Sequence, residues 1–270
     1  MAFVNYTTGN LAIKIVYYGP GLSGKTTNLR YIYTNMDADF RGELICLETD
    51  TERTLFFDLL PIKAGIIGDF KIHLQLMTVP GQVFYAASRK SVLKGVDGIV
   101  FVADSQIPLL DANLESFDGL RRNLLAHHVD LNFIPLVFQY NKRDLDNLIP
   151  VETFNSLLNP HGFPYIETCA IKGKGVFETL KEITKLAIPM VKEKIREDER
   201  RIVGKDRVKK KKEGEKEKSK KEVPEKKDEI KFVAKDKAAP LRVTKVKFKS
   251  QKDIEEELEN LAKDFTKSKD

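Results

Sequence analysis

Short runs of apolar, largely β-branched residues alternate with longer amphipathic stretches over residues 1–196. The runs are bounded by Gly, Pro, Asp or Asn, a pattern typical of buried strands. They lie at 11–18, 72–79, 98–103 and 134–140. The amphipathic stretches predict helices around 25–36, 84–94, 111–127, 151–158 and 175–196. Apolar strands that alternate with helices predict an α/β fold, with a mostly parallel central sheet covered by helices on both faces.

The pattern changes near residue 197. From there to about residue 250 lysine and glutamate dominate, and we expect a disordered tail because little apolar surface is left to offset the entropy of ordering. Residues 251–266 again place apolar side chains at helical spacing. The sequence therefore predicts one domain over 1–196, a disordered tail over 197–250 and a short amphipathic helix over 251–266. That helix is either marginal by itself or a docking element for a partner's groove.

Charge is unevenly spread along the 270 residues, which carry a net charge of +6 at pH 7. Residues 1–192 contain 19 Lys and Arg against 20 Asp and Glu, whereas residues 193–270 contain 27 against 20. The basic character therefore belongs to the tail and indicates nothing about what the folded body binds. The stretch 205–212 is either a solvated linker or a nonspecific contact for anionic surfaces. Because no aromatic residues accompany it, we expect no specific nucleic-acid site.

The remaining composition bears on the compartment. The two cysteines, Cys46 and Cys169, are far apart and lack the spacing of a metal site, which is typical of a reducing environment. No apolar run approaches the length of a membrane span, and we see no secretory signal or lipidation motif. We therefore expect a cytoplasmic protein without an integral membrane segment.

Residues 19–27, GPGLSGKTT, match the phosphate-binding pattern G-x-x-x-x-G-K-[ST] between a predicted strand and a predicted helix. Glycines let the backbone wrap a phosphate, and the start of a helix adds positive potential. Lysine reaches the β and γ phosphates, and the threonine hydroxyl coordinates Mg²⁺. The candidate phosphate-site residues are Gly19, Gly21, Ser23, Gly24, Lys25, Thr26 and Thr27.

Residues 141–144, NKRD, follow the apolar run 134–140 and indicate which base is bound. Asp144 can accept hydrogen bonds from the N1–H and N2–H₂ groups of guanine, whereas adenine lacks both donors and would leave the carboxylate unpaired. Asn141 can engage the purine and fasten the loop, and the Lys142 stem can pack over the ring. In the later loop ETCA, Cys169 and Ala170 complete the candidate base site, with the Ala170 amide facing the guanine oxygen.

Taken in order, the P-loop, TVPGQ at 78–82, NKRD and ETCA resemble the motifs of a Ras-like small GTPase. Stretches such as TERTLFFDLLP, VPGQVFYAASRK and LKGVDGIVFVADSQ resemble the MglA-type GTPases of bacterial motility and cell polarity. The resemblance spans about residues 3–192. It implies a P-loop NTPase fold with a monomeric Ras-like G domain that binds GTP or GDP with Mg²⁺ and hydrolyses GTP.

The resemblance also implies partners and roles. A Roadblock-domain partner would stimulate hydrolysis, and polarity or motility effectors would bind the GTP form, at cell poles or motility complexes. Gln82 would position the attacking water beside Gly81, although a structural role at a helix start is the alternative. Arg53 would act as an arginine finger in cis, with a surface ion pair as the alternative. Thr54 is the best candidate for the second hydroxyl on Mg²⁺, ahead of Thr49 and Thr51.

The sequence departs from the Ras-like pattern at two positions. Thr78 stands where an aspartate usually helps to hold Mg²⁺ through a water, and Asp50 or Asp58 could supply that carboxylate. Ile171 stands where a lysine commonly packs over the base. Phe56, Phe57 and Phe84 are either core or hinge residues or anchors for a partner.

Two other functions compete with the GTPase. One is a nucleotide-stabilised scaffold with little turnover that recruits partners through its charged tail. The other is an ATP-dependent phosphotransferase, which NKRD and the lack of a substrate lid disfavour.

Overall fold

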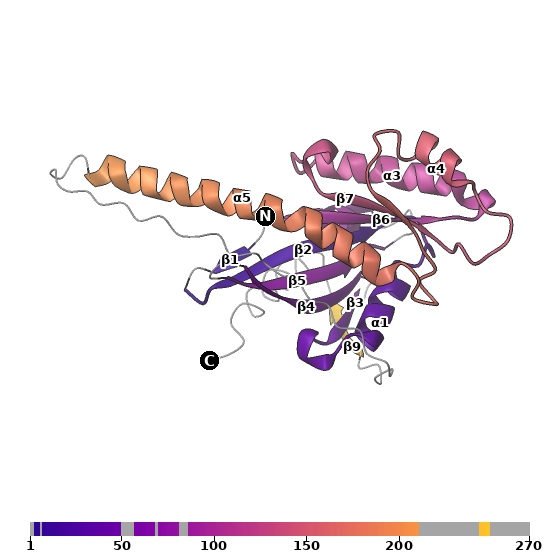
Figure 1. The fold of residues 1–270 in the computed structure, drawn as a ribbon, viewed down its shortest axis with the longest axis horizontal. Helices are drawn as coiled ribbons and strands as arrows, with labels where there is room; N and C mark the ends of the chain where they lie inside the picture. The colour runs from indigo at the N-terminus through magenta and orange to yellow at the C-terminus, as the bar shows by residue number, and fades with distance from the viewer. Residues whose placement is uncertain are drawn as a thin grey trace.

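The computed structural model describes residues 3–5, 7–49, 57–67, 70–80, 86–210 and 243–248. Within these ranges the strands form one sheet in the order β8-β7-β6-β2-β5-β4-β3-β9, and β1 pairs with β2 outside this path. Helices lie on both faces of the sheet (Figure 1). The predicted α/β fold with a mostly parallel sheet is confirmed.

The strands are β1 (Phe3–Asn5), β2 (Asn10–Tyr18), β3 (Leu44–Thr49), β4 (Phe57–Ile67), β5 (Phe70–Thr78), β6 (Gly98–Asp104), β7 (Leu136–Asn141), β8 (Tyr165–Glu167) and β9 (Val243–Phe248). The α-helices are α1 (Lys25–Asn35), α2 (Ala86–Leu93), α3 (Leu110–Leu125), α4 (Val151–Leu157) and α5 (Val176–Lys210). Short 3₁₀ turns are η1 (Ala38–Phe40), η3 (Ile107–Leu109) and η4 (Leu131–Phe133). Among the described residues, no helix is long and apolar enough to cross a membrane.

Strand direction divides the sheet into two parts. The strands from β8 through β5 run parallel, so their carboxyl ends meet at one edge. From β5 the sheet continues through the antiparallel β4 and β3. Because ligands of such sheets bind beyond the carboxyl ends of the parallel strands, this arrangement places the loops after β2, β6 and β7 around one candidate site.

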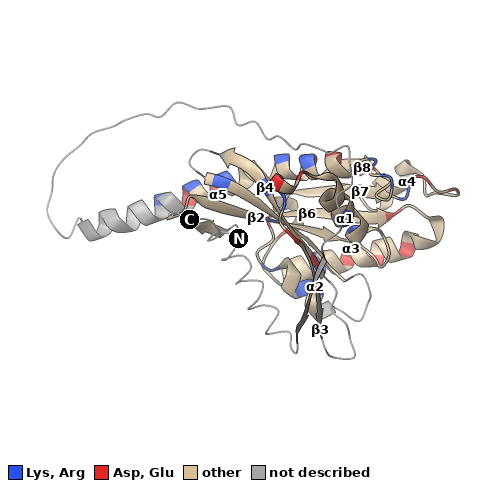
Figure 2. Cartoon of the chain, turned by 90° about the horizontal axis from the view of Figure 1, so that it is seen from below, with Lys and Arg blue, Asp and Glu red and all other residues tan. Residues whose placement is uncertain are grey.

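Each face of the sheet buries its own apolar cluster. One cluster joins the sheet to α1 and α5 through residues such as Leu29, Ile32, Leu180 and Ile183. The other joins it to α2, α3 and α4. Figure 2 shows charged residues mainly on the helices and loops around the central strands, which carry few. Burial on both faces explains why these strands read as continuous apolar runs.

The four predicted strands and five predicted helices are all present, but the hairpin next to them was missed. The sequence indicates Thr49, Thr51 and Thr54 only as candidates for the hydroxyl on Mg²⁺ and predicts no strands around them. In the structure β3 runs to Thr49 and β4 begins at Phe57, so only 50–56 lies between the two strands. Phe57 is buried in the cluster that includes α3, which makes it a core residue. Phe56 and Phe84 lie outside the described residues.

Within 197–250, where the sequence predicts a disordered tail, the structure describes two elements. Helix α5 continues to Lys210, because Glu, Lys and Arg are good helix formers even without a core to pack on. Its deeply buried positions end at Ile195 within the side chains described. In addition, β9 pairs with β3, since the stretch VTKVKF is rich in the β-branched and aromatic residues that favour strands. The predicted helix 251–266 lies outside the described residues.

Candidate functional site

The P-loop lies between the end of β2 at Tyr18 and the start of α1 at Lys25, as the sequence predicted. Gly19 and Gly24 both have positive φ, and a Cβ at either position would overlap a neighbour. At Gly19 that neighbour is the Val102 carbonyl oxygen, and at Gly24 it is the side-chain amide of Asn141. The loop conformation therefore requires glycine at both positions.

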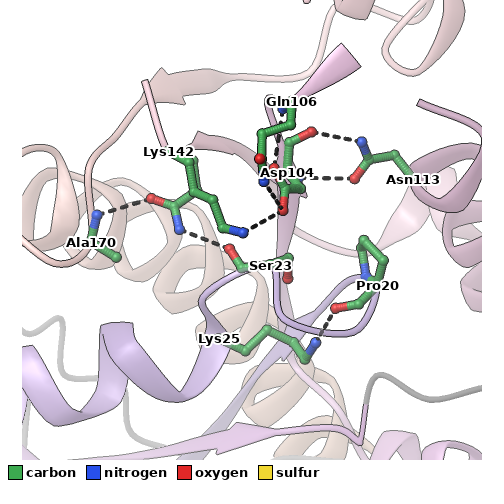
Figure 3. A network of polar contacts seen from close by, with 9 residues as sticks. Pro20, Ser23, Lys25, Asp104, Gln106, Asn113, Lys142 and Ala170 are labelled. Carbon is green, nitrogen blue, oxygen red and sulfur yellow. Dashed lines mark hydrogen bonds and ion pairs between the residues drawn. The ribbon is translucent and has the colours of Figure 1, made fainter. Parts of the chain in front are cut away.

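Two polar groups inside this loop fit an anion. The Lys25 ammonium donates to the carbonyl oxygens of Gly19 at 2.9 Å and Pro20 at 2.6 Å, so it lies within the loop (Figure 3). Burial lowers the pKa of Lys25 to about 7, assisted by the nearby Arg89 and opposed by Asp58. The Ser23 hydroxyl is buried and has no hydrogen-bond partner within the described part of the chain. A cation that is bonded to carbonyl oxygens and an unpaired hydroxyl both suit a phosphate.

Asn141 joins three loops with one side-chain amide. Its Nδ2 donates to the Ser23 carbonyl of the P-loop at 2.8 Å. Its Oδ1 accepts from the Ala170 backbone N–H at 2.9 Å and from the Thr168 hydroxyl at 3.0 Å. The amide is buried, so these bonds occupy its acceptor and one of its donor hydrogens. Asn141 thus fastens the loops, the second of the two roles that the sequence suggested.

Lys142 and Asp144 lie on either side of the same turn. Lys142 has a φ of 67°, and its ammonium pairs with Asp104 Oδ2 at 2.6 Å, which holds the stem across the end of β6. Asp144 pairs with Lys172 at 3.2 Å. Hydrogen bonding from the Cys169 thiol, and then from Lys172, lowers the pKa of Asp144. The Asp144 carboxylate is therefore ionised at neutral pH and can accept from two N–H donors.

A second carboxylate lies on the phosphate side. The Thr26 hydroxyl donates to Asp58 Oδ2 at 2.6 Å, and the Thr78 hydroxyl donates to the same oxygen at 3.0 Å. The backbone N–H of Asp58 donates in turn to the Thr78 hydroxyl at 2.8 Å. Asp58 and Thr78 are both buried. Of the two aspartates suggested by the sequence, Asp58 reaches the threonine that would hold Mg²⁺, and Asp50 lies outside the described residues.

The structure thus brings together the P-loop, NKRD and ETCA, with Cys169 and Ala170 buried beside Asn141 and Ile171 exposed. It does not describe Arg53, Thr54, Gly81 or Gln82, so their predicted roles stay predictions. Sequence reasoning missed Asp104 and Thr168, which hold Lys142 and Asn141. Asp104 directly follows the apolar run 98–103, so its place at the carboxyl end of a predicted strand was the signal that could have found it.

A mostly parallel sheet with a P-loop after β2 and NKRD at the end of β7, two strands along the sheet, defines the class: a P-loop protein with the Ras-like small GTPase fold. No family model matches the chain. The chain is 55% identical over 192 residues to the mutual gliding-motility protein MglA of Myxococcus xanthus (strain DK1622). That match covers 71% of this chain and 98% of the relative. The chain therefore belongs to the MglA family of small GTPases, as its motifs indicated.

Proposed function

We propose that this protein binds GTP and GDP and hydrolyses GTP to GDP and phosphate, as a switch in gliding motility or cell polarity. The observation that supports this most directly is the Asn141 amide, which joins the P-loop carbonyl of Ser23 to the Ala170 amide. Because these bonds hold the phosphate-binding loop and the base-binding loops together, one nucleotide can span them. The name of the M. xanthus relative supports the role in gliding motility.

In this proposal guanine lies between the loops 141–144 and 168–171. Asp144 accepts from N1–H and N2–H₂, and the Ala170 N–H, which donates to Asn141 Oδ1, shares its hydrogen with the guanine oxygen. The Lys142 stem, held by Asp104, covers one face of the ring. Ile171, 76% exposed, offers an apolar side chain where a lysine is common.

On the phosphate side, Lys25 leaves the carbonyls of Gly19 and Pro20 to pair with the β and γ phosphates. Mg²⁺, when bound, would neutralise charge on the phosphates. Thr26 would ligate it, together with Thr54, and Asp58 would orient the Thr26 hydroxyl by accepting its hydrogen bond. We further propose that Gln82 positions the attacking water and that Arg53 neutralises charge on the transferred phosphoryl group. A Roadblock-domain activator and polarity or motility effectors are proposed as partners.

The assignment of guanine is tested by changing Asp144, so that position 144 prefers the hydrogen-bonding edge of xanthine. In Asp144→Asn the amide oxygen still accepts from N1–H, while its NH₂ donates to the oxygen that xanthine carries at position 2. We expect the native chain to bind GDP far more tightly than XDP, and Asp144→Asn to prefer XDP, with each change on the order of 10²-fold or more. Asp146→Asn, on the same turn and exposed, is the matched control and should keep the native preference.

Hydrolysis is tested by a single-turnover assay on the full chain, with GTP and ATP run in parallel and Arg53→Ala alongside. Turnover of GTP alone, slowed on the order of 10³-fold by the substitution, is the expected result. Bound GTP that persists in the native chain both alone and with a Roadblock-domain partner would contradict the enzymatic part of the proposal. The binding part would then rest on the base preference alone.

A further inference from the structure

The outermost strand of the sheet comes from the tail. β9 (Val243–Phe248) runs parallel to β3 (Leu44–Thr49), and the register continues from Leu44 opposite Val243 to Thr49 opposite Phe248. Figure 1 places β9 beside β3 at the edge of the sheet. A segment more than 190 positions later in the sequence than β3 therefore completes the sheet.

Without β9, β3 would be an edge strand. Its sequence, LICLET, is mostly apolar, and an edge strand presents a row of unpaired N–H and C=O groups that can pair with another chain. Natural edges are commonly protected by lysine on the outermost strand, and β9 carries Lys245 and Lys247. The tail strand thus has the composition of a strand that covers one edge and resists further pairing.

The tether between α5 and β9 allows this pairing within one molecule. Residues 211–242 join Lys210 to Val243. A chain of this length spans on the order of 100 Å when extended, which is enough to return from α5 to β3. A tether of this kind gives its own strand an effective concentration of about a millimolar, so a partner strand of equal intrinsic affinity must reach about that free concentration to displace half of it.

The comparison with the M. xanthus relative bears on the tail that supplies β9. The relative is matched along 98% of its length by only 71% of this chain, so it has no counterpart for most of the tail. A strand supplied by the tail is therefore an addition to a domain that the family already has. An addition that covers an edge strand acts on what that edge can bind.

We propose that the outer edge of β3 is a strand-docking surface, that residues 243–248 occupy it in cis, and that they exclude partner strands from it. The partner that fits is an extended segment of alternating β-branched and basic residues, because such a segment reproduces β9. β9 also flanks β3 at Cys46, the register partner of Asp58 on β4. Resting on the proposed function, the docked strand supports β3 and, through it, the contact of Asp58 with Thr26, and slows nucleotide exchange.

The pairing itself is tested with a native cysteine. Cys46 and Lys245 are register partners, and Cα atoms on neighbouring strands lie within the range that a disulfide bridges. In the full chain, Lys245→Cys should therefore form an intramolecular disulfide with Cys46 under mild oxidation. Thr244→Cys and Val246→Cys, each one position out of register, are the matched controls and should couple much more slowly.

Non-reducing electrophoresis and peptide mapping distinguish the outcomes. A monomer in which Cys46 is linked to the cysteine introduced by Lys245→Cys supports docking in cis. A disulfide-linked dimer would mean that the strand crosses to a second copy, and equal coupling in all three variants would mean that no fixed register exists. Either result overturns the proposal, and neither depends on nucleotide chemistry.

The exclusion of partners is tested by releasing the strand. Backbone N–H groups of successive strand residues point to opposite sides of a strand. Thr244→Pro/Lys247→Pro therefore removes one N–H on each side of β9, and at least one hydrogen bond between β9 and β3 is lost. A fluorescent peptide of residues 241–250 should bind this variant at least 10-fold more tightly than it binds the native chain. Lys220→Pro, in the tether, is the control. Equal peptide affinity in all three proteins would overturn the proposal.

The effect on the nucleotide site is read from GDP release in the same proteins. The released variant should lose GDP several-fold faster than the native chain and the Lys220→Pro control. Unchanged release would refute the coupling from β9 through β3 to Asp58. If the native chain binds no guanine nucleotide, the proposed function fails, while the disulfide and peptide results still decide whether β3 is a docking surface.

Discussion

The two ends of the candidate nucleotide site are built by different means. On the base side, a single buried amide, Asn141, closes hydrogen bonds among loops that follow parallel strands. On the phosphate side, Asp58 and Thr78 belong to the antiparallel pair β4 and β5, and they reach Thr26 at the start of α1. The first arrangement is local to short motifs, whereas the second depends on how a hairpin is placed against a helix.

This difference explains why Thr78 does not leave the site without a carboxylate. The residue that usually supplies it lies on β5, but here the neighbouring strand β4 supplies Asp58 and Thr78 holds it in place. Compared with the usual Ras-like pattern, the carboxylate therefore lies on β4 instead of β5, and it contacts Thr26 of the P-loop. A motif search that inspects position 78 alone finds no aspartate there, although Asp58 makes the contact with Thr26.

The largest effect should come from the base side, with Asn141→Ala. The substitution leaves the Ser23 carbonyl and the Ala170 N–H without their partner, and each such buried group costs about 1–3 kcal/mol. The Thr168 hydroxyl keeps only its long contact of 3.5 Å with the Tyr140 carbonyl. We expect GDP affinity to fall on the order of 100-fold, measured by competition with a fluorescent nucleotide.

The control for Asn141→Ala is Asn159→Ala. Asn159 is also buried and makes two hydrogen bonds to the Phe163 backbone, away from the site. It should lower the melting temperature and leave GDP affinity near the native value. If both variants weaken GDP binding equally, Asn141 stabilises the fold without any special role in joining the loops.

The next largest effect should come from the phosphate side, with Asp58→Asn. The amide keeps the shape but accepts more weakly from the Thr26 hydroxyl, and changes of this kind around a metal cost about 10–100-fold in metal affinity. Mg²⁺ slows GDP release, and we expect the Mg²⁺ concentration that gives half of its maximal effect on the release rate to rise about 10-fold. Asp58→Ala should shift it in the same direction, and an unchanged Mg²⁺ titration would refute the role of Asp58.

An exchange of the two residues tests whether the carboxylate has moved between strands. Thr78→Asp alone places a second carboxylate against Asp58 Oδ2, which lies 3.0 Å from the hydroxyl it replaces. Repulsion between the two buried carboxylates should lower the stability at neutral pH. Asp58→Thr/Thr78→Asp restores one carboxylate and one hydroxyl, and should recover most of the Mg²⁺ response. Failure of the double variant to improve on Thr78→Asp would contradict the exchange.

The comparison also separates what the sequence predicts from what it leaves open. Asn141, Asp144 and Lys25 were found because their motifs are short and follow apolar runs that fold as predicted. Asp58 was suggested only as one of two aspartates, since its contact with Thr26 depends on the register of β4 against β5. β9 was missed for a related reason: a lysine-rich strand has no visible partner in the sequence until β3 is known to be an edge.

The smallest expected effect concerns pH and Lys25. Burial lowers the pKa of Lys25 to about 7, so the nucleotide-free site loses its charge as the pH rises through that value. Phosphate must bind the charged form, so GDP affinity should fall about 5-fold between pH 7 and pH 8. In Lys25→Arg the guanidinium stays charged, and this pH dependence should disappear.

Stability of the nucleotide-free protein should change in the opposite direction. Between a pH of about 7 and the ordinary lysine pKa of 10.5, the unfolded chain binds a proton that folded Lys25 does not. The destabilisation caused by burying Lys25 is therefore greatest below that window and decreases as the pH rises through it. Denaturant unfolding at pH 7 and pH 9, native chain against Lys25→Arg, measures it. A native GDP affinity that stays constant between pH 7 and pH 8 while the stability rises would mean that phosphate binding does not use the Lys25 charge.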